Sequence, residues 1–351
     1  MGGYNEVSVL ASGSIKPDIM LLESPNRIAL AFSNAKINAP ITMSGPSPLI
    51  RMIQAAQFDE NTVYVIIEPN ETVTYSYTSI IGKNKFILEF SKAKPGSGKK
   101  VAPSPLTPEA CPVSSPEVIV PEEIETPAAA PEEIEKEENV PPEEVKPEKI
   151  APAIKPVKPA KVSLPLKGKV VVVDAGHGGR DPGYVSVSGI FEKAINLKIA
   201  LKLKQFLEKA GAKVLMTRTR DVDIKNRDIV RIANCSKADM FVAVHLNAFS
   251  SPRIRGCETF YYTPKSRKLA QAMQKYLYGT IRTKNNGVRR VQYYAVHRTK
   301  MPSVLVESAY LTNPKEEKLI LSSKFQDLVA QGMCKGITEY VKISSWRRYH
   351  R

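Results

Sequence analysis

One stretch of the chain, residues 93–166, is so rich in proline that it is not expected to belong to a packed domain. It holds 16 of the 27 prolines of this 351-residue chain, together with pairs of glutamates and no aromatic residue. Proline removes backbone hydrogen-bond donors, and a segment without aromatic side chains has little to bury. We therefore predict a disordered Pro/Glu/Lys-rich linker that spans roughly 200 Å when fully extended, at about 3.1 Å per residue. It divides the chain into two folded regions.

The net charge differs between these regions. The whole chain has a formal net charge of +16. Residues 1–92 and 93–166 carry −1 and −4, whereas residues 167–351 carry +21. The basic C-terminal region predicts an anionic partner: nucleic acid, an anionic membrane or an anionic wall polymer. Apolar runs are far shorter than the roughly 18 residues that cross a bilayer, so we expect no integral membrane segment.

The cysteines and the N-terminus say little about location. Four cysteines without a CxxC pair predict no disulfide framework in a chain of this length. The first residues show neither the basic nor the apolar segment of a secretory leader. Read alone they indicate a cytosolic protein, but a processed leader would leave the same appearance.

Residues 1–92 are expected to form a small all-β domain. β-branched and aromatic residues gather in short stretches separated by Pro, Gly and Asn. The expected strands lie near 7–10, 27–32, 62–67, 72–77 and 85–90. The region has no histidine, no cysteine and no carboxylate cluster. We expect a β-sandwich that binds or targets rather than catalyses.

Residues 167–342 alternate strand and helix patterns, and a basic tail follows at 343–351. The alternation predicts an α/β domain, a mostly parallel twisted sheet flanked by helices. We expect strands at 169–174, 213–217, 240–245, 258–262 and 303–308, and helices at about 192–210, 223–234, 266–278 and 323–341.

Two histidines and two glutamates stand where such a sheet forms its functional sites. His177 follows the first strand of the sheet in a glycine-rich turn, and His245 ends a later strand. Glu307 ends an otherwise apolar strand, and Glu192 opens the first long helix. Sites in open α/β sheets form beyond the carboxyl ends of the strands, so we expect these side chains to meet.

Two histidines, a carboxylate and a position left for water form a common catalytic zinc set. Zinc lowers the pKa of its bound water to about 7 and polarises a scissile carbonyl, and a second carboxylate moves the proton. His177, Glu192 and His245 as Zn²⁺ ligands, with Glu307 as general base and acid, satisfy this count. The spacing lacks an HExxH motif, and either histidine taken alone is more simply a buried structural residue.

Five sequence blocks carry a resemblance to a known family. They are VVDAGHGGRDPG at 172–183, FEK at 191–193, AN at 233–234, ADMFVAVHLNA at 238–248, and MPSVLVES at 301–308 with LTNP at 311–314. In this order they resemble the zinc-dependent N-acetylmuramoyl-L-alanine amidases of the amidase_3 family. The resemblance implies hydrolysis of the amide between N-acetylmuramic acid and L-alanine of the peptidoglycan stem peptide. It assigns His177, Glu192 and His245 to zinc and Glu307 to catalysis.

Departures from that family pattern are mild. Leu246 replaces a usually small residue, and residues 308–310 vary a segment that is more often Leu-Gly-Phe. Some members of the family plug the zinc with a long inserted helix, for which residues 263–265 leave no room. We therefore expect no autoinhibition of that form.

The N-terminal region carries a second, weaker resemblance. Residues 21–30, LLESPNRIAL, are similar to the Leu-x-x-Pro-x-Arg segment of AMIN domains, with Ala31 in place of a frequent aspartate. This resemblance implies that residues 1–92 bind peptidoglycan or localise the enzyme at division sites.

Asn247 and Arg289 are candidate substrate-binding residues. Asn247 follows His245 by two positions, and Arg289 lies in a basic loop suited to substrate carboxylates. A strand-end cap and a solvated loop are the alternatives. For His297, near the strand that delivers Glu307, we favour a role other than ligand.

The combined prediction is a peptidoglycan hydrolase of cell-wall turnover or daughter-cell separation, with division-site or activator proteins as possible partners. A non-catalytic wall-binding protein on an amidase scaffold is the alternative. A nucleic-acid partner is disfavoured because the chain contains no recognisable nucleic-acid module. Because peptidoglycan lies outside the cytoplasmic membrane, we expect a periplasmic or extracellular enzyme whose leader is not visible in this chain.

Overall fold

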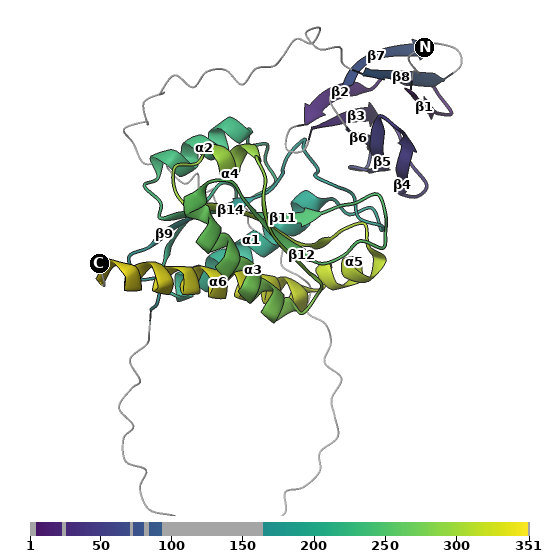
Figure 1. Cartoon of the computed structure of the whole chain (residues 1–351). Helices are drawn as coiled ribbons and strands as arrows, with labels where there is room; N and C mark the ends of the chain where they lie inside the picture. The colour runs from purple at the N-terminus through teal and green to yellow at the C-terminus, as the bar shows by residue number, and fades with distance from the viewer. Residues whose placement is uncertain (1–4, 23–25, 71–72, 81–83, 93–163, 350–351) are drawn as a thin grey trace, which may run out of the picture. The chain divides into compact units, whose positions relative to one another are not determined.

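The computed structural model describes residues 5–22, 26–70, 73–80, 84–92 and 164–349 (Figure 1). The predicted linker, 93–166, lies outside the described residues except for its last three positions.

The N-terminal region folds into two antiparallel sheets, which confirms the predicted all-β domain. The larger sheet has the strand order β2-β3-β6-β5-β4, and the smaller has the order β1-β8-β7. Leu30, Ile67 and Phe86 belong to one apolar core to which both sheets contribute. The strands are β1 (Asn5–Leu10), β2 (Asp18–Leu22), β3 (Arg27–Ser33), β4 (Ile41–Ser47), β5 (Ile50–Gln57), β6 (Thr62–Pro69), β7 (Val73–Ile80) and β8 (Lys85–Lys92).

Three strands of the larger sheet, β2, β4 and β5, are absent from the sequence-based expectation. The clearest case is β5, whose IRMIQAAQ sequence is rich in Ala, Gln and Met rather than β-branched residues. It is nevertheless hydrogen-bonded to β4 on one side and β6 on the other. Burial between two partners outweighs its weak intrinsic preference for a strand.

The C-terminal region is the predicted α/β domain, built on a six-stranded sheet of order β10-β9-β11-β14-β12-β13. Every neighbouring pair is parallel except β12 and β14, so the expectation of a mostly parallel sheet is confirmed. The strands are β9 (Val170–Ala175), β10 (Lys213–Met216), β11 (Met240–Asn247), β12 (Cys257–Tyr261), β13 (Asn285–Arg290) and β14 (Ser303–Tyr310).

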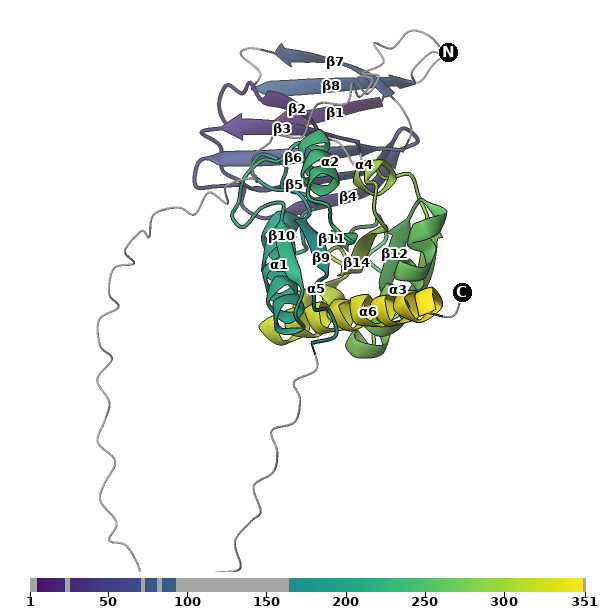
Figure 2. The ribbon, with the colours of Figure 1, turned by 90° about the vertical axis from the view of Figure 1, so that its left-hand side faces the viewer.

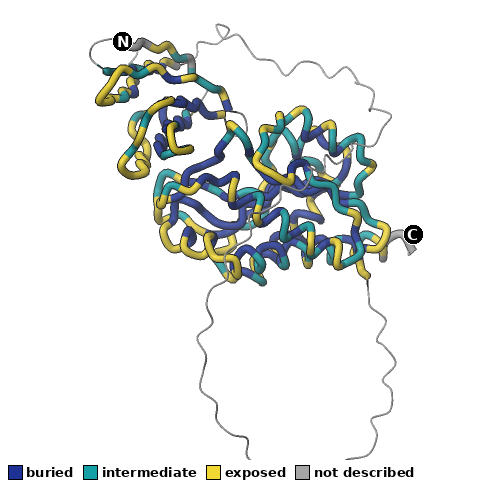
Figure 3. The backbone as a smooth tube through the Cα atoms, turned by 180° about the vertical axis from the view of Figure 1, so that it is seen from behind, coloured by how far each residue is buried: buried dark blue, intermediate teal, exposed yellow. Residues whose placement is uncertain are grey.

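Helices cover both faces of this sheet, as Figures 1 and 2 show. The helices are α1 (Glu192–Lys209), α2 (Asn226–Cys235), α3 (Arg267–Ile281), α4 (Tyr294–Arg298), α5 (Pro314–Ile320) and α6 (Ser323–Tyr349). α1, α3 and α6 pack with strand residues such as Val171 and Val242, whereas α2 and α4 pack with Val172 and Phe241. Successive strand residues face opposite sides of a sheet, so both faces are apolar and the strands are buried (Figure 3).

Several details differ from the expectation or add to it. Residues 285–290, predicted as part of a basic loop, form the edge strand β13, and α6 continues to Tyr349 instead of ending near residue 341. Between β12 and α3 stands the short 3-10 helix η1 (Pro264–Ser266) and no long inserted helix. Within the described residues, no helix combines the length and apolar character that a membrane crossing requires.

Candidate active site

The predicted site residues lie along the carboxyl edge of three adjacent strands, β9, β11 and β14. His177 follows β9, His245 lies near the end of β11, and Glu307 on β14 is paired with His245 across the two strands. Glu192 is the first residue of α1 and is almost completely buried. The order of the strands in the sheet therefore places side chains that are far apart in the sequence at one edge.

The turn that carries His177 depends on two glycines. A Cβ atom added at Gly176 would lie 2.2 Å from Cε1 of His245, and one added at Gly183 would lie 2.5 Å from Cβ of Glu192. Gly183 also has a φ of +72°, which other residues rarely adopt. With no side chains in the way, the imidazole rings of His177 and His245 approach to 4.9 Å between centroids.

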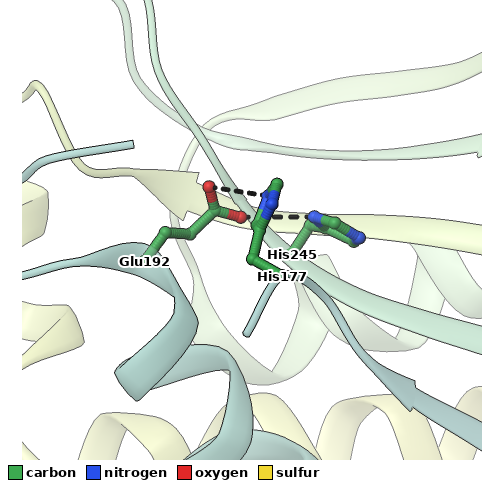
Figure 4. A group of neighbouring side chains, drawn as sticks. All are labelled: His177, Glu192 and His245. Atoms are coloured by element: carbon green, nitrogen blue, oxygen red, sulfur yellow. Dashed lines mark hydrogen bonds and ion pairs between the residues drawn. The ribbon is translucent and has the colours of Figure 1, made fainter. Parts of the chain in front are cut away.

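Each carboxylate oxygen of Glu192 contacts one of the two imidazole rings (Figure 4). Its Oε2 is 3.1 Å from Nε2 of His177, and its Oε1 is 3.2 Å from Nδ1 of His245. The donor atoms of the three residues all lie within 4.8 Å of one another. Two imidazole nitrogens and a carboxylate oxygen are donors that suit a borderline divalent metal. These three residues therefore form a possible metal site.

A second layer of hydrogen bonds holds this cluster. Nδ1 of His177 is 2.8 Å from Oδ2 of Asp181. The Glu192 carboxylate accepts the backbone N–H of Tyr184 at 3.0 Å and the side-chain amide of Asn196 at 2.9 Å. Such outer contacts fix the orientation of a ligand and tune its basicity.

The cluster favours a positive charge at its centre. Burial disfavours the charged form of His177, but the carboxylates of Asp181 and Glu192 outweigh burial and raise the pKa of His177 to about 10. Burial acts against the ionised form of Glu192 as well, yet His177 and His245 hold the pKa of Glu192 well below its usual range. A cation among these groups therefore meets carboxylates that are already ionised and oriented.

Arg218, which the sequence analysis does not single out, braces the backbone of the same region. Its Nε donates to the carbonyl of Ala175 at 2.8 Å, and its Nη2 donates to the carbonyls of Gly176 at 3.0 Å and Lys193 at 2.8 Å. It thereby ties the end of β9 to the first turn of α1. Nothing in the TRTR run at 217–220 distinguishes Arg218 from Arg220 before the fold is known.

Glu307 differs from Glu192 in its surroundings. Its side chain is buried, and its Oε2 finds no hydrogen-bond partner within the described part of the chain. Burial, reinforced by the charges of Glu192 and Glu258, raises the pKa of Glu307 well above the usual glutamate value. A carboxyl group of raised pKa in a pocket is suited to exchange a proton with a substrate.

Asn247 and Arg289 both contact Glu258, another residue absent from the sequence-based set. Nδ2 of Asn247 donates to Oε1 of Glu258 at 2.8 Å, and Nη1 of Arg289 donates to its Oε2 at 2.8 Å. All three line one pocket together with His245 and Glu307. The sequence could have indicated Glu258, because it is a carboxylate in the apolar strand CETFY. The same kind of signal marked Glu307.

Two other residues lie apart from this pocket. His297 in α4 is not among the residues that line it, and its Nδ1 is 3.3 Å from Nε2 of Gln292. Arg227 in α2 is 3.9 Å from the carboxylate of Asp228.

Comparison with protein families gives two matches. Residues 171–339 match the family described as N-acetylmuramoyl-L-alanine amidase, and residues 1–90 match the AMIN domain. The boundaries of these matches correspond to the two folded regions of the chain.

Two curated relatives of the C-terminal region are named as N-acetylmuramoyl-L-alanine amidases. The germination-specific N-acetylmuramoyl-L-alanine amidase of Bacillus subtilis (strain 168) is 33% identical over 195 residues, which cover 51% of this chain and 82% of the relative. N-acetylmuramoyl-L-alanine amidase LytC of the same strain is 31% identical over 195 residues, covering 54% of this chain and 39% of LytC. Among solved structures, the catalytic domain of CwlV from Bacillus (Paenibacillus) polymyxa var. colistinus is 39% identical with a TM-score of 0.49, covering 50% of this chain and 98% of that domain. The chain therefore belongs to the N-acetylmuramoyl-L-alanine amidase family.

Proposed function

We propose that this amidase is zinc-dependent and hydrolyses the amide bond between N-acetylmuramic acid and L-alanine of the stem peptide. His177, Glu192 and His245 hold the Zn²⁺ ion, and Glu307 is the general base and acid. The observation that carries this proposal is the convergence of three ligand side chains within 4.8 Å, in one pocket with a buried carboxyl group. The donor set fits zinc because it combines imidazole nitrogen with carboxylate oxygen.

The chemistry that Zn²⁺ supplies in such a site is Lewis acidity, which raises the acidity of water and polarises a carbonyl. Glu307 accepts a proton from the attacking water as the new C–O bond forms at the lactyl carbonyl. It then delivers that proton to the amide nitrogen as the C–N bond breaks. The products are the lactyl carboxylate and a stem peptide with a free L-alanine amino group.

The surroundings of Glu307 support this role. A group that takes up and returns a proton works best when its pKa lies near the working pH. Burial moves the pKa of Glu307 upward in that direction. Asp181 orients His177 instead of exchanging a proton with the substrate. Its Oδ2 contacts Nδ1 of His177, and Nε2 of the same ring then faces Glu192.

Asn247 and Arg289 form the proposed substrate-binding side of the pocket. Arg289 is the stronger candidate, because its side chain remains 62% exposed while one nitrogen is anchored on Glu258. Both polar atoms of the Asn247 side chain are hydrogen-bonded within the pocket wall. Its Nδ2 donates to Glu258, and its Oδ1 accepts the backbone N–H of Ala248 at 2.8 Å. We assign it to shaping the pocket wall that the substrate meets.

We further propose that the protein acts on the cell wall outside the cytoplasmic membrane, in the periplasm or the extracellular space. The +21 charge of residues 167–351 favours retention on an anionic wall polymer. The AMIN domain would add targeting to peptidoglycan or to division sites. The cellular role in this proposal is wall turnover or daughter-cell separation, with an activator protein as a possible partner.

Digestion of purified sacculi tests this function. We expect the wild-type chain to release stem peptides with new amino-terminal L-alanine, detected by amino-group labelling and mass spectrometry. A chelator should stop the release, and added Zn²⁺ should restore it. Cleavage at a different bond would contradict the proposed reaction. Absence of any cleavage by zinc-loaded protein would favour the non-catalytic wall-binding alternative.

A further inference from the structure

A single buried carboxylate, that of Glu258, organises part of the wall of the pocket that His177, Glu192 and His245 also line. Glu258 is 1% exposed and accepts hydrogen bonds from three side chains on three different strands. Two donors are neutral, Nδ2 of Asn247 at 2.8 Å and the hydroxyl of Tyr310 at 2.7 Å. The third is the charged Nη1 of Arg289 at 2.8 Å. A buried carboxylate needs such partners, and the arginine supplies the compensating charge.

The direction of β12 places Glu258 beside the reaction centre. β12 runs antiparallel to β14, and Glu258 near its start is paired directly with Glu307. Arg289 reaches the same place from β13, the next strand outward. Arg289, Glu258 and Glu307 therefore line the same pocket.

One nitrogen of Arg289 is held by a hydrogen bond, while much of its side chain is accessible to solvent. Its Nη1 is fixed by Glu258, and the guanidinium lies 5.6 Å from the ring centroid of Phe260. Its side chain is nevertheless 62% exposed. Compensating the charge of Glu258 uses one nitrogen of Arg289, so the other N–H groups of the guanidinium are available to a ligand. A guanidinium held in one orientation, with N–H groups facing solvent, suits paired hydrogen bonds to a carboxylate.

We propose that Arg289, held in place by Glu258 as a positioning residue, forms a carboxylate-binding subsite for the stem peptide. The subsite would take a free carboxylate on the part of the peptide that follows the scissile L-alanine amide. This inference rests on the proposed amidase function and adds to it a determinant of substrate choice. It predicts that the enzyme distinguishes stem peptides bearing a carboxylate from those bearing the corresponding carboxamide.

The test compares two soluble muramoyl peptides that differ only in one group. In one, the residue after L-alanine carries a free carboxylate, and in the other it carries a carboxamide. For Arg289→Ala we expect KM for the carboxylate peptide to rise about tenfold while kcat changes less than about twofold, because one charge-assisted contact is lost. Glu258→Gln should raise this KM as well, and it should also change kcat because the charge of Glu258 helps to raise the pKa of Glu307. KM for the carboxamide peptide should stay nearly constant. Arg289→Lys should recover part of the loss, since it keeps the charge without the planar fork.

Two controls separate a local effect from a general one. Arg290→Ala removes the neighbouring arginine of β13, whose Nε donates to the carbonyl of Tyr262, and should leave both KM values unchanged. The zinc content and Tm of each variant show whether Glu258→Gln has disturbed the fold. If Glu258→Gln has disturbed the fold, the test rests on the KM values of Arg289→Ala and Arg289→Lys for the carboxylate peptide.

Equilibrium binding separates this subsite from the amidase reaction. In a Glu307→Gln background, calorimetry measures the affinity for each muramoyl peptide without turnover. We expect tighter binding of the carboxylate peptide and loss of that preference on Arg289→Ala. Equal affinity for both peptides before the substitution, or an equal loss of affinity for both on Arg289→Ala, would contradict the proposed subsite. Lack of turnover by the wild type, with the binding preference intact, would instead count against the proposed amidase function alone.

Discussion

Two buried glutamates of the same pocket, one at the start of α1 and one on β14, have opposite surroundings. Glu192 meets two imidazoles, two backbone N–H groups and a side-chain amide, and its pKa is lowered. Glu307 has one oxygen without a partner in the described chain, and its pKa is raised. Residue type alone does not separate these two carboxylates.

We interpret this contrast as a difference in function between Glu192 and Glu307. A carboxylate that stays ionised and fixed suits a metal ligand, whereas one that takes up a proton easily suits an acid or base. Pairs of titratable groups whose environments move their pKa values apart are the usual mark of such assignments. The following changes test whether the contrast between Glu192 and Glu307 has this meaning.

Glu307→Gln should produce the largest effect. The substitution keeps the size of the side chain but removes its ability to accept a proton, so kcat on sacculi should fall by about 10²- to 10⁴-fold. Zinc content, measured by elemental analysis, should remain that of the wild type. Glu208→Gln, at an exposed position on α1, is the matched control and should cleave normally. Cleavage by Glu307→Gln at the wild-type rate would remove Glu307 from the mechanism.

Asp181→Asn should have an intermediate effect, and on metal affinity rather than on proton transfer. The variant keeps the shape of the side chain next to His177 but loses the charge that orients and polarises the ring. Zinc affinity should fall about 10- to 100-fold, as measured by competition with a chromophoric chelator. Asp223→Asn, which alters an exposed ion pair with Arg180, is the control. Unchanged zinc affinity in Asp181→Asn would show that this contact is not part of the metal site.

The smallest expected effect is on stability. Because the pKa of Glu307 is raised by folding, the folded state binds this proton more tightly than the unfolded state. The associated stability is present below the ordinary glutamate pKa of 4.5 and is lost as pH rises through the higher folded pKa. Metal-free Glu307→Gln should therefore match the wild type in acid and exceed it at higher pH, with a gain of about 2–4 °C in Tm for each kcal/mol. Thermal denaturation of both proteins across this pH range measures the difference, and parallel curves would contradict it.

Much of the site was accessible from the sequence because one rule applied. His177, His245 and Glu307 follow or end apolar stretches, and parallel strands bring their carboxyl ends to one edge. Glu258 escaped this rule because β12 runs antiparallel to β14, which brings the start of β12 to that edge. The direction of a strand relative to its neighbour is set by the connections and packing of the whole domain. The carboxylate in CETFY is a visible signal, but no local pattern in that segment reveals the direction of the strand.

The fold was predictable to a similar degree. Strands with clear runs of β-branched residues, such as β6 and β9, follow from composition alone. The edge strand β13 has the sequence NNGVRR, which has no alternation of apolar and polar residues, and only its pairing with β12 makes it a strand. Prediction failed where the structure depends on a neighbour rather than on the segment itself.

The close approach of Gly176 to His245 has a consequence for how this chain can diverge. Any side chain at position 176 would occupy the space of the imidazole ring at position 245. Gly183 is confined in the same way by Glu192 and His177. The residue at each glycine position and the side chain that it faces therefore cannot change independently, although they are separated in the sequence. Among descendants of this protein, Gly176 should vary only where His245 has already been lost, whereas Gly183 should stay glycine because its φ of +72° disfavours any side chain.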